Sequence, residues 1–179
     1  MEQRTAKINI SSAGGTAGQD SKTYKVTLPA AWLETMGVTR EQRDLVLRFD
    51  GTSITLSRPV SGPDFAVRQR SLGHDVRILR LYDGKELCSS IYADLTSQLI
   101  VAENHVVSPV KTAFGNNALP DWGDFQSFLS SRCIPRQRAG LREYLEVLGL
   151  EEYDPFAIIE KTGGRMAEDQ QWLTIEVVK

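Results

Sequence analysis

The sequence predicts an α+β protein of two domains, and three observations lead to this prediction. Residues 1–58 contain short segments in which polar and apolar residues alternate, the period of half-buried strands, around a single short helix. A segment rich in Pro, Gly and Ser at 57–63 then interrupts the pattern. Beyond it, alternation returns and changes to helical periodicity from Pro120. We therefore expect an N-terminal domain over 1–59 and a C-terminal α+β domain over 64–179.

The composition is that of an ordinary folded protein. The 179 residues have a formal net charge of -2 and 41% hydrophobic residues, which excludes a disordered chain. No stretch approaches the ~20 apolar residues that a membrane helix needs, and the first residues lead into no signal-peptide core. We expect a cytoplasmic protein with no membrane partner.

In the N-terminal domain we expect four strands and one helix. Pro29 and Gly37 mark the two ends of the helix, because proline suits a first helical turn and glycine a C-terminus. Asp50-Gly51 is a strong hairpin signal between the last two strands. The expected strands are Ala6–Ile10, Tyr24–Leu28, Asp44–Phe49 and Ser53–Ser57, and the expected helix is Ala30–Met36.

In the C-terminal domain we expect a small antiparallel sheet and three helices. The expected strands are Val76–Leu81, Glu86–Ile91, Leu99–Ala102 and Trp172–Val178. The first helix begins near Trp122 with Asp121 or Asp124 as its cap, the second opens at Pro135, and the third covers Phe156–Thr162 after an Asp154-Pro155 start.

Signals of catalysis are few. His74 and His105 have no metal-type spacing and are expected to be surface or loop histidines. Cys88 and Cys133 are expected to be reduced thiols, with Cys133 buried in an apolar run. We expect no metal, no cofactor and no enzyme activity, although a site that combines Cys133 with a histidine and an acid stays open, because such partners meet only in space. The glycine-rich segment 14–22 lacks the spacing of a phosphate-binding loop.

The charge is distributed unevenly. Residues 1–58 contain eight Lys and Arg against six acidic residues, whereas the remainder contains 13 against 17. The N-terminal excess is small in one chain, but it doubles in a symmetric dimer whose two copies both contact phosphates.

One run of residues resembles a known family. Lys25–Val38 consists of a basic residue, Val-Thr-Leu-Pro, a short helix and Met-Gly-Val, and a strand pair follows it. This order resembles the AbrB/MazE/SpoVT swapped-hairpin superfamily over about residues 5–58. The resemblance implies a homodimer in which two copies interlace their hairpins into one β-barrel. Physical reasoning agrees, since some fifty residues bury too little apolar surface alone.

The resemblance also implies a DNA-binding site on the first hairpin. Lys25 occupies the family's basic position, Lys7 and Lys22 are expected to contact phosphates, and Arg4 is a further candidate. Thr23 and Thr27 are expected to reach base edges of double-stranded DNA. The chain departs from the family pattern at Leu33 and Glu34, where arginines are common, and in its long first loop. An N-terminal module that only dimerises therefore stays open as an alternative.

A second basic cluster lies in the C-terminal domain. Arg132, Arg136, Arg138 and Arg142 occur within eleven residues that contain no acid. Placed around a helix N-terminus, they would favour an anionic partner such as the acidic surface of a protein or a nucleic acid. Alternatively, the acidic residues that follow from Glu143 neutralise them as solvated pairs.

The C-terminal part also bears a faint resemblance to small bacterial proteins that accompany HipA-like kinase toxins. The similar segments are Trp122–Leu129, Arg132–Arg136, Tyr153–Pro155 and Thr162–Trp172. The resemblance implies a bacterial origin and a toxin as partner. The expected function is a dimeric DNA-binding transcriptional regulator or antitoxin whose C-terminal domain binds a toxin or another protein. The alternative is an adaptor that uses its N-terminal module only to dimerise.

Overall fold

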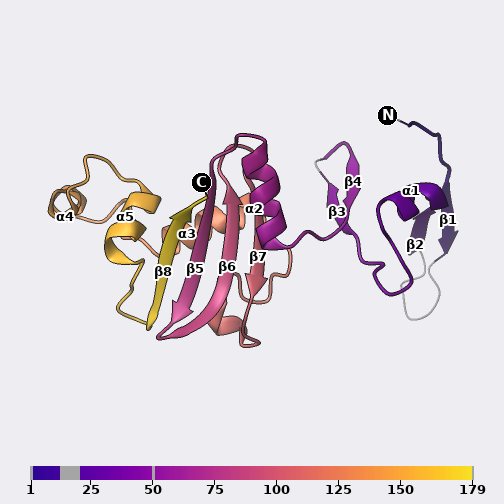
Figure 1. Cartoon of the computed structure of the whole chain (residues 1–179). Coiled ribbons are helices and arrows are strands. Elements are labelled where there is room, and N and C mark those ends of the chain that lie inside the picture. The colour runs from indigo at the N-terminus through magenta and orange to yellow at the C-terminus, as the bar shows by residue number, and fades with distance from the viewer. Residues whose placement is uncertain (1, 13–20, 50, 179) are drawn as a thin grey trace. The chain divides into compact units, whose positions relative to one another are not determined.

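The computed structural model describes residues 2–12, 21–49 and 51–178, and the chain divides into two compact units, Met1–Pro59 and Val60–Lys179 (Figure 1). Five α-helices and several small antiparallel sheets occur in these ranges, which confirms the α+β class. Most of the glycine-rich segment that we compared with a phosphate-binding loop, and Asp50 of the expected Asp-Gly turn, lie outside the described residues.

The first unit contains two separate hairpins and a helix. Strands β1 (Ile8–Ser12) and β2 (Lys22–Val26) pair antiparallel, and β3 (Val46–Phe49) pairs with β4 (Ile54–Ser57) in the same way. Helix α1 (Ala30–Thr35) follows Pro29 and ends before Gly37, whose φ of +71° suits glycine. The expected elements are therefore confirmed, although β1 lies two residues later and β2 two residues earlier than expected, and β3 starts two residues later.

None of the sheets formed by the described residues is closed into a barrel. In the described part of the first unit, every residue is exposed or half-buried and none is buried. Two hairpins of four or five residues per strand expose most of their surface, because a two-stranded sheet has no second layer to cover it.

The second unit has a four-stranded antiparallel sheet in the order β7-β6-β5-β8. Its strands are β5 (Val76–Asp83), β6 (Glu86–Asp94), β7 (Leu99–Asn104) and β8 (Gln171–Val177). The expected meander is thus confirmed, and the last strand of the chain joins it beside β5.

Helices cover both faces of this sheet (Figure 1). On one face, α2 (Gly62–Ser71) packs Phe65 and Ala66 against Val76 and Tyr92. On the other face lies the larger core, where α3 (Trp122–Ser131) and α5 (Pro155–Thr162) pack on the sheet. The main buried residues of this core are Leu79, Leu81, Ile91, Phe125, Ile158 and Ile159. A short 3-10 turn, Pro109–Lys111, lies between β7 and α3.

Helix α2 is not among the helices expected from the sequence. We took Pro63 as part of a break between domains, whereas it lies in the first turn of α2, where a missing N–H costs nothing. The Ser61 side chain accepts a hydrogen bond from the Asp64 N–H at 3.3 Å and caps this helix. Residues 60–63 therefore belong to the second unit, whose described residues form four α-helices rather than the expected three.

The start of one expected helix was wrong. Residues Pro135 to Arg138 form a turn, closed by the Arg138 N–H on the Pro135 carbonyl at 3.1 Å. Helix α4 (Leu141–Leu148) begins only after Gly140, whose φ of +80° directs the chain into it. The starts of the other two helices are confirmed, because Asp121 and Asp154 cap α3 and α5 as expected.

Candidate functional site

The first hairpin has a polar face that holds four of the expected DNA-binding residues. The register places Asn9 opposite Lys25 and Ser11 opposite Thr23. Because side chains alternate along a strand, these two opposite pairs share one face, and Lys7 and Thr27 continue that face just outside β1 and β2. The four expected residues on it are Lys7, Thr23, Lys25 and Thr27. All of them are exposed except Thr23, which is half-buried.

Two other expected DNA-binding residues lie elsewhere. Lys22 pairs with Ser12 at the end of the hairpin and, by the same alternation, is on the face opposite to Lys25. Arg4 is exposed in the irregular segment before β1. The structure therefore divides the expected set between the polar face, the strand end and the chain before the hairpin.

The opposite face of the first hairpin is apolar and uncovered. Ile8, Ile10, Tyr24 and Val26 alternate with the polar set and are 50% to 63% exposed. The second hairpin repeats this feature, since Leu47, Phe49 and Ile54 share a face and are 61% to 70% exposed. Apolar side chains gathered in this way are typical of a surface that another chain covers.

Helix α1 contributes no positive charge to this unit. Glu34 is exposed, and the helix has no basic residue in its last turn. Trp32 donates from Nε1 to the Glu2 carboxylate at 2.5 Å, which fastens the segment before β1 to the helix. Any attraction for phosphate in this unit therefore comes from outside the helix.

Only two of the four arginines of the C-terminal cluster lie at the helix N-terminus that we expect to gather them, because Arg138 and Arg142 flank the start of α4, whereas Arg132 follows α3 and Arg136 lies in the turn between the two helices. Arg132, the residue after α3, is 6% exposed and pairs with Asp169 at 2.6 Å. The Arg136 guanidinium lies 4.4 Å from the centre of the Tyr153 ring, and Arg142 pairs with Glu146 along α4 at 3.2 Å. Only Arg136, Arg138 and Arg142 are exposed to a partner.

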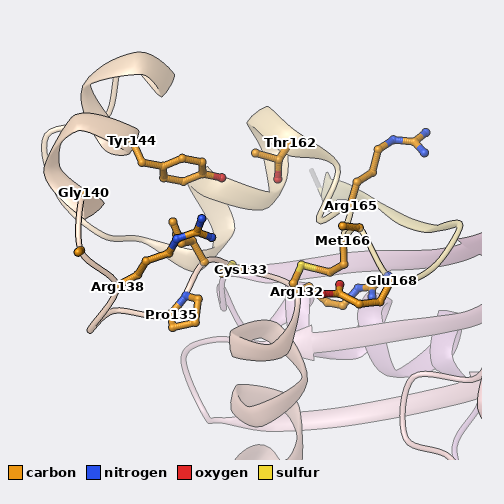
Figure 2. A pocket seen from close by; sticks show the side chains of 13 residues that line it. Arg132, Cys133, Pro135, Arg138, Gly140, Tyr144, Thr162, Arg165, Met166 and Glu168 are labelled. Atoms are coloured by element: carbon orange, nitrogen blue, oxygen red, sulfur yellow. The ribbon is translucent and has the colours of Figure 1, made fainter.

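A pocket of about 430 Å³ lies among these elements (Figure 2). The end of α3, the 135–140 turn, α4, the end of α5 and the chain over 165–168 form its walls. Figure 2 shows the side chains of Arg138 and Tyr144 on one side, Thr162 above, and Met166 with Glu168 on the other side. Arg132 and Cys133, two residues singled out from the sequence, also line it.

Tyr144, Thr162 and Arg165 are pocket residues that no sequence pattern predicts. In the sequence, Tyr144 repeats with apolar residues at helical spacing, and Thr162 and Arg165 flank the Gly163-Gly164 pair, which is typical of a helix end, so neither pattern indicates a pocket. No spacing rule relates these positions, because three different elements bring them together.

Cys133 is a buried thiol, as expected, and its environment keeps it protonated. Burial raises the pKa of the Cys133 thiol to about 11. Its Sγ donates weakly to the Pro155 carbonyl at 3.7 Å. His105 is exposed and lies 2.9 Å from Ser90 Oγ, whereas His74 is half-buried against the fully buried Asp94 at 2.7 Å. His74 therefore lies in the loop before β5, as expected, and in addition has a structural partner in Asp94.

Across residues 2–12, 21–49 and 51–178, no group of three or more His, Cys, Asp or Glu side chains could hold a metal ion. In the same residues, no helix has the length and apolar character needed to cross a membrane.

Comparison of the chain with family models, with curated proteins and with solved structures gave no match.

Proposed function

We propose that this protein is a dimeric DNA-binding transcriptional regulator or antitoxin, built like the swapped-hairpin proteins that its Lys25–Val38 run resembles. The observation that supports this proposal best is the two-faced first hairpin. One face holds Lys7 and Lys25 among small polar side chains, and the other is apolar and exposed. A surface of the first kind suits DNA phosphates, and one of the second kind suits a protein.

The proposed dimer follows from the missing core. The described residues of the first unit include no buried side chain, although both hairpins have an apolar face. A second copy is the proposed cover, because interlaced hairpins would bury these faces and pair the free strand edges at the same time. The barrel and the dimer belong to this proposal.

The proposed DNA contact uses the polar face, which would remain outside. Lys7 and Lys25 from both copies would neutralise phosphates, while Thr23 and Thr27 would approach base edges. Lys22, at the strand end on the face opposite Lys25, and Arg4, before β1, would add phosphate contacts at the margins of the hairpin. Such binding depends steeply on salt, because each neutralised phosphate releases counterions.

The second unit is proposed to bind a partner protein, a toxin in the antitoxin version. Arg136 and Arg142 are exposed and would meet an acidic surface, whereas the buried Arg132 is not accessible to one. Co-expression with the product of the adjacent reading frame tests the proposed partner binding. A stable complex that is lost when the charges of Arg136 and Arg142 are both reversed would support it.

The DNA part is tested by reversing the charge of both lysines on the polar face. We expect the Lys7→Glu/Lys25→Glu variant to lose the gel shift of a random-sequence duplex pool while its sedimentation stays that of the unaltered protein. Lys85→Glu, an exposed lysine of the second unit, is the matched control and should leave binding unchanged. With four lysines per dimer, the affinity of the unaltered protein should fall about 10²-fold between 50 and 200 mM salt.

Two results would reject the DNA-binding proposal. One is an equal shift by the double variant and the unaltered protein, which would remove the polar face from the site. The other is a stable dimer that shifts no duplex even at low salt. The second result would favour the adaptor, which agrees with the exposed Glu34 and the absence of basic residues in the last turn of α1.

A further inference from the structure

The pocket beside α4 has the size and lining of a small-ligand site. Its volume of about 430 Å³ lies in the range of such sites, about 300 to 1,000 Å³. Ile134, Pro135, Ala139 and Met166 provide apolar surface, and a few polar side chains stand among them. This combination suits a ligand with an apolar body and one charged group.

Two fixed contacts hold the walls of the pocket in place. Arg132 donates to both carboxylate oxygens of Asp169, at 2.6 and 3.3 Å, and so ties the end of α3 to the chain before β8. The Tyr153 hydroxyl donates to the Ile134 carbonyl at 2.9 Å and fixes the segment that leads into the 135–140 turn. A ligand would therefore enter a preformed site, which lowers the entropic cost of binding.

The charge of the pocket is positive. Three arginines and one glutamate line it, and Asp169 neutralises Arg132. Arg138 and Arg165 form no ion pair with any described residue, so they exceed Glu168 by one positive charge. Arg165 lies at the rim, 5.4 Å from the centre of the Trp172 ring, which leaves Arg138 as the cation beside Tyr144 (Figure 2).

The neighbouring Tyr144 hydroxyl and Cys133 thiol keep their protons, so they do not reduce the excess positive charge of the pocket. Burial raises the pKa of the Tyr144 hydroxyl, which therefore remains a hydrogen-bond donor at neutral pH. It donates to no other described residue. The Cys133 thiol, also in the lining, is neutral for the same reason and adds no negative charge that would repel an anion.

We propose that this pocket binds a small organic anion. The Arg138 guanidinium and the Tyr144 hydroxyl would donate hydrogen bonds to its carboxylate or phosphate group, and its apolar body would lie against Pro135 and Met166. The pocket is formed by residues of the second unit and the proposed DNA-binding face by residues of the first, so the two proposals can fail independently.

The test is a titration of the protein with small-molecule probes. Calorimetry measures the affinity of each probe, and shifts of backbone amide resonances show where it binds. The probes are benzoate, phenyl phosphate, inorganic phosphate and benzamide, the last having the shape of benzoate without its charge. We expect benzoate or phenyl phosphate to bind at least about tenfold more tightly than benzamide. Whichever of benzoate and phenyl phosphate binds more tightly identifies the preferred anionic group. Weaker binding of inorganic phosphate than of phenyl phosphate measures how much the apolar ring contributes to the affinity.

Variants then locate the site. Arg138→Gln should weaken binding of the preferred anion about tenfold or more, and Tyr144→Phe should weaken it less. Arg138 is exposed, so its variant should fold, and Tyr144→Phe keeps the packed ring. Arg68→Gln, an exposed arginine on α2 that lines no part of the pocket, is the control and should bind as the unaltered protein does.

Three outcomes would overturn this proposal. The first is that neither benzoate nor phenyl phosphate binds more tightly than benzamide. The second is that Arg138→Gln and Arg68→Gln bind the preferred anion equally well. The third is that a glutamate-rich decapeptide binds in a way that requires Arg138 and that benzoate does not displace it. This result would make the surface a docking site for an acidic protein segment.

Discussion

The arginines of the C-terminal cluster show how environment separates residues that look equivalent in sequence. Arg132 is 6% exposed and forms two hydrogen bonds with Asp169, whereas the side chain of Arg142 is 90% exposed beside Glu146. A buried guanidinium that loses its partner destabilises the folded state, because it has also lost its hydration, whereas an exposed guanidinium remains hydrated with or without a partner. The Arg132–Asp169 pair therefore stabilises the fold, while the Arg142–Glu146 pair contributes little.

We expect Asp169→Asn to lower the free energy of unfolding by about 1 to 3 kcal/mol, because it leaves a buried cation with a weaker partner. Urea denaturation measures this loss. Glu146→Gln removes the acid of the exposed pair and should cost less than about 0.5 kcal/mol. Equal losses in the two variants would show that burial of Arg132 has no energetic consequence.

The same variant has a second readout in its pH dependence. Hydrogen bonds from Arg132 are the main reason that the pKa of Asp169 lies below its ordinary value of 3.8. A carboxylate with a lowered pKa in the folded state stabilises the protein above its unfolded pKa, and this contribution disappears as the pH falls through the folded value. We therefore expect the unaltered protein to lose stability below about pH 4, and Asp169→Asn to lose less over the same interval.

At the scale of elements, local signals predicted strands better than helix starts. All eight strands that the described residues form were expected, because period-two alternation and turn residues are local properties of the chain. Pro63 and Pro135 caused the two helix errors, since proline occurs both in turns and in the first turn of a helix. What separates them is tertiary contact: Phe65 and Ala66 of α2 are buried on the sheet, whereas residues 135–140 are exposed.

The candidate sites were predictable to different degrees. The two-faced hairpin follows from alternation within one short segment, and residues such as Lys25 were expected there. The pocket could not be expected, because α4, α5 and the chain around Arg165 meet only after folding. Arg132 shows the same limit, since its partner Asp169 is 37 residues away in the sequence.

Helix α2 provides a test at this scale. A Cβ added to Gly62 would lie 1.9 Å from a ring carbon of Tyr92, a side chain of the core beneath the helix. We expect Gly62→Ala to displace the helix and to lower the free energy of unfolding by about 1 to 3 kcal/mol. Thermal unfolding would show this as a melting temperature lower by several degrees.

Gly123→Ala is the matched control for that substitution. Gly123 also lies in the first turn of a helix, and its added Cβ would meet only the Asp121 carboxylate, at 3.2 Å. The Oδ1 atom that it meets accepts the cap hydrogen bond from the Asp124 N–H at 2.9 Å, and a shift of a few tenths of an ångström keeps that bond, so this variant should melt within about 2 °C of the unaltered protein. A Gly62→Ala variant with the melting temperature of the control would mean that Tyr92 can yield and that α2 does not depend on this close approach.

At the scale of the whole molecule, the two units differ in how far they can fold alone. The second unit has buried clusters on both faces of its sheet, so its own residues provide the core that a domain needs. The first unit has no buried residue in its described part. Its stability is therefore proposed to depend on a second copy, and hence on protein concentration.

The last prediction tests this dependence with two neighbouring residues of β1. Ile10 lies on the apolar face opposite Tyr24, and Ser11 lies on the polar face opposite Thr23. Ile10→Asp places a charge in the proposed dimer interface, and we expect sedimentation equilibrium to show a monomer at concentrations where the unaltered protein is a dimer. Ser11→Asp adds the same charge one residue later, where it should leave the dimer intact and weaken DNA binding by repelling phosphate.

Because a shift of one residue reverses the face, opposite effects of the two variants would locate the interface on the apolar side. An Ile10→Asp protein that remains a dimer would exclude this face from the interface and would remove the main support for the swapped-hairpin arrangement.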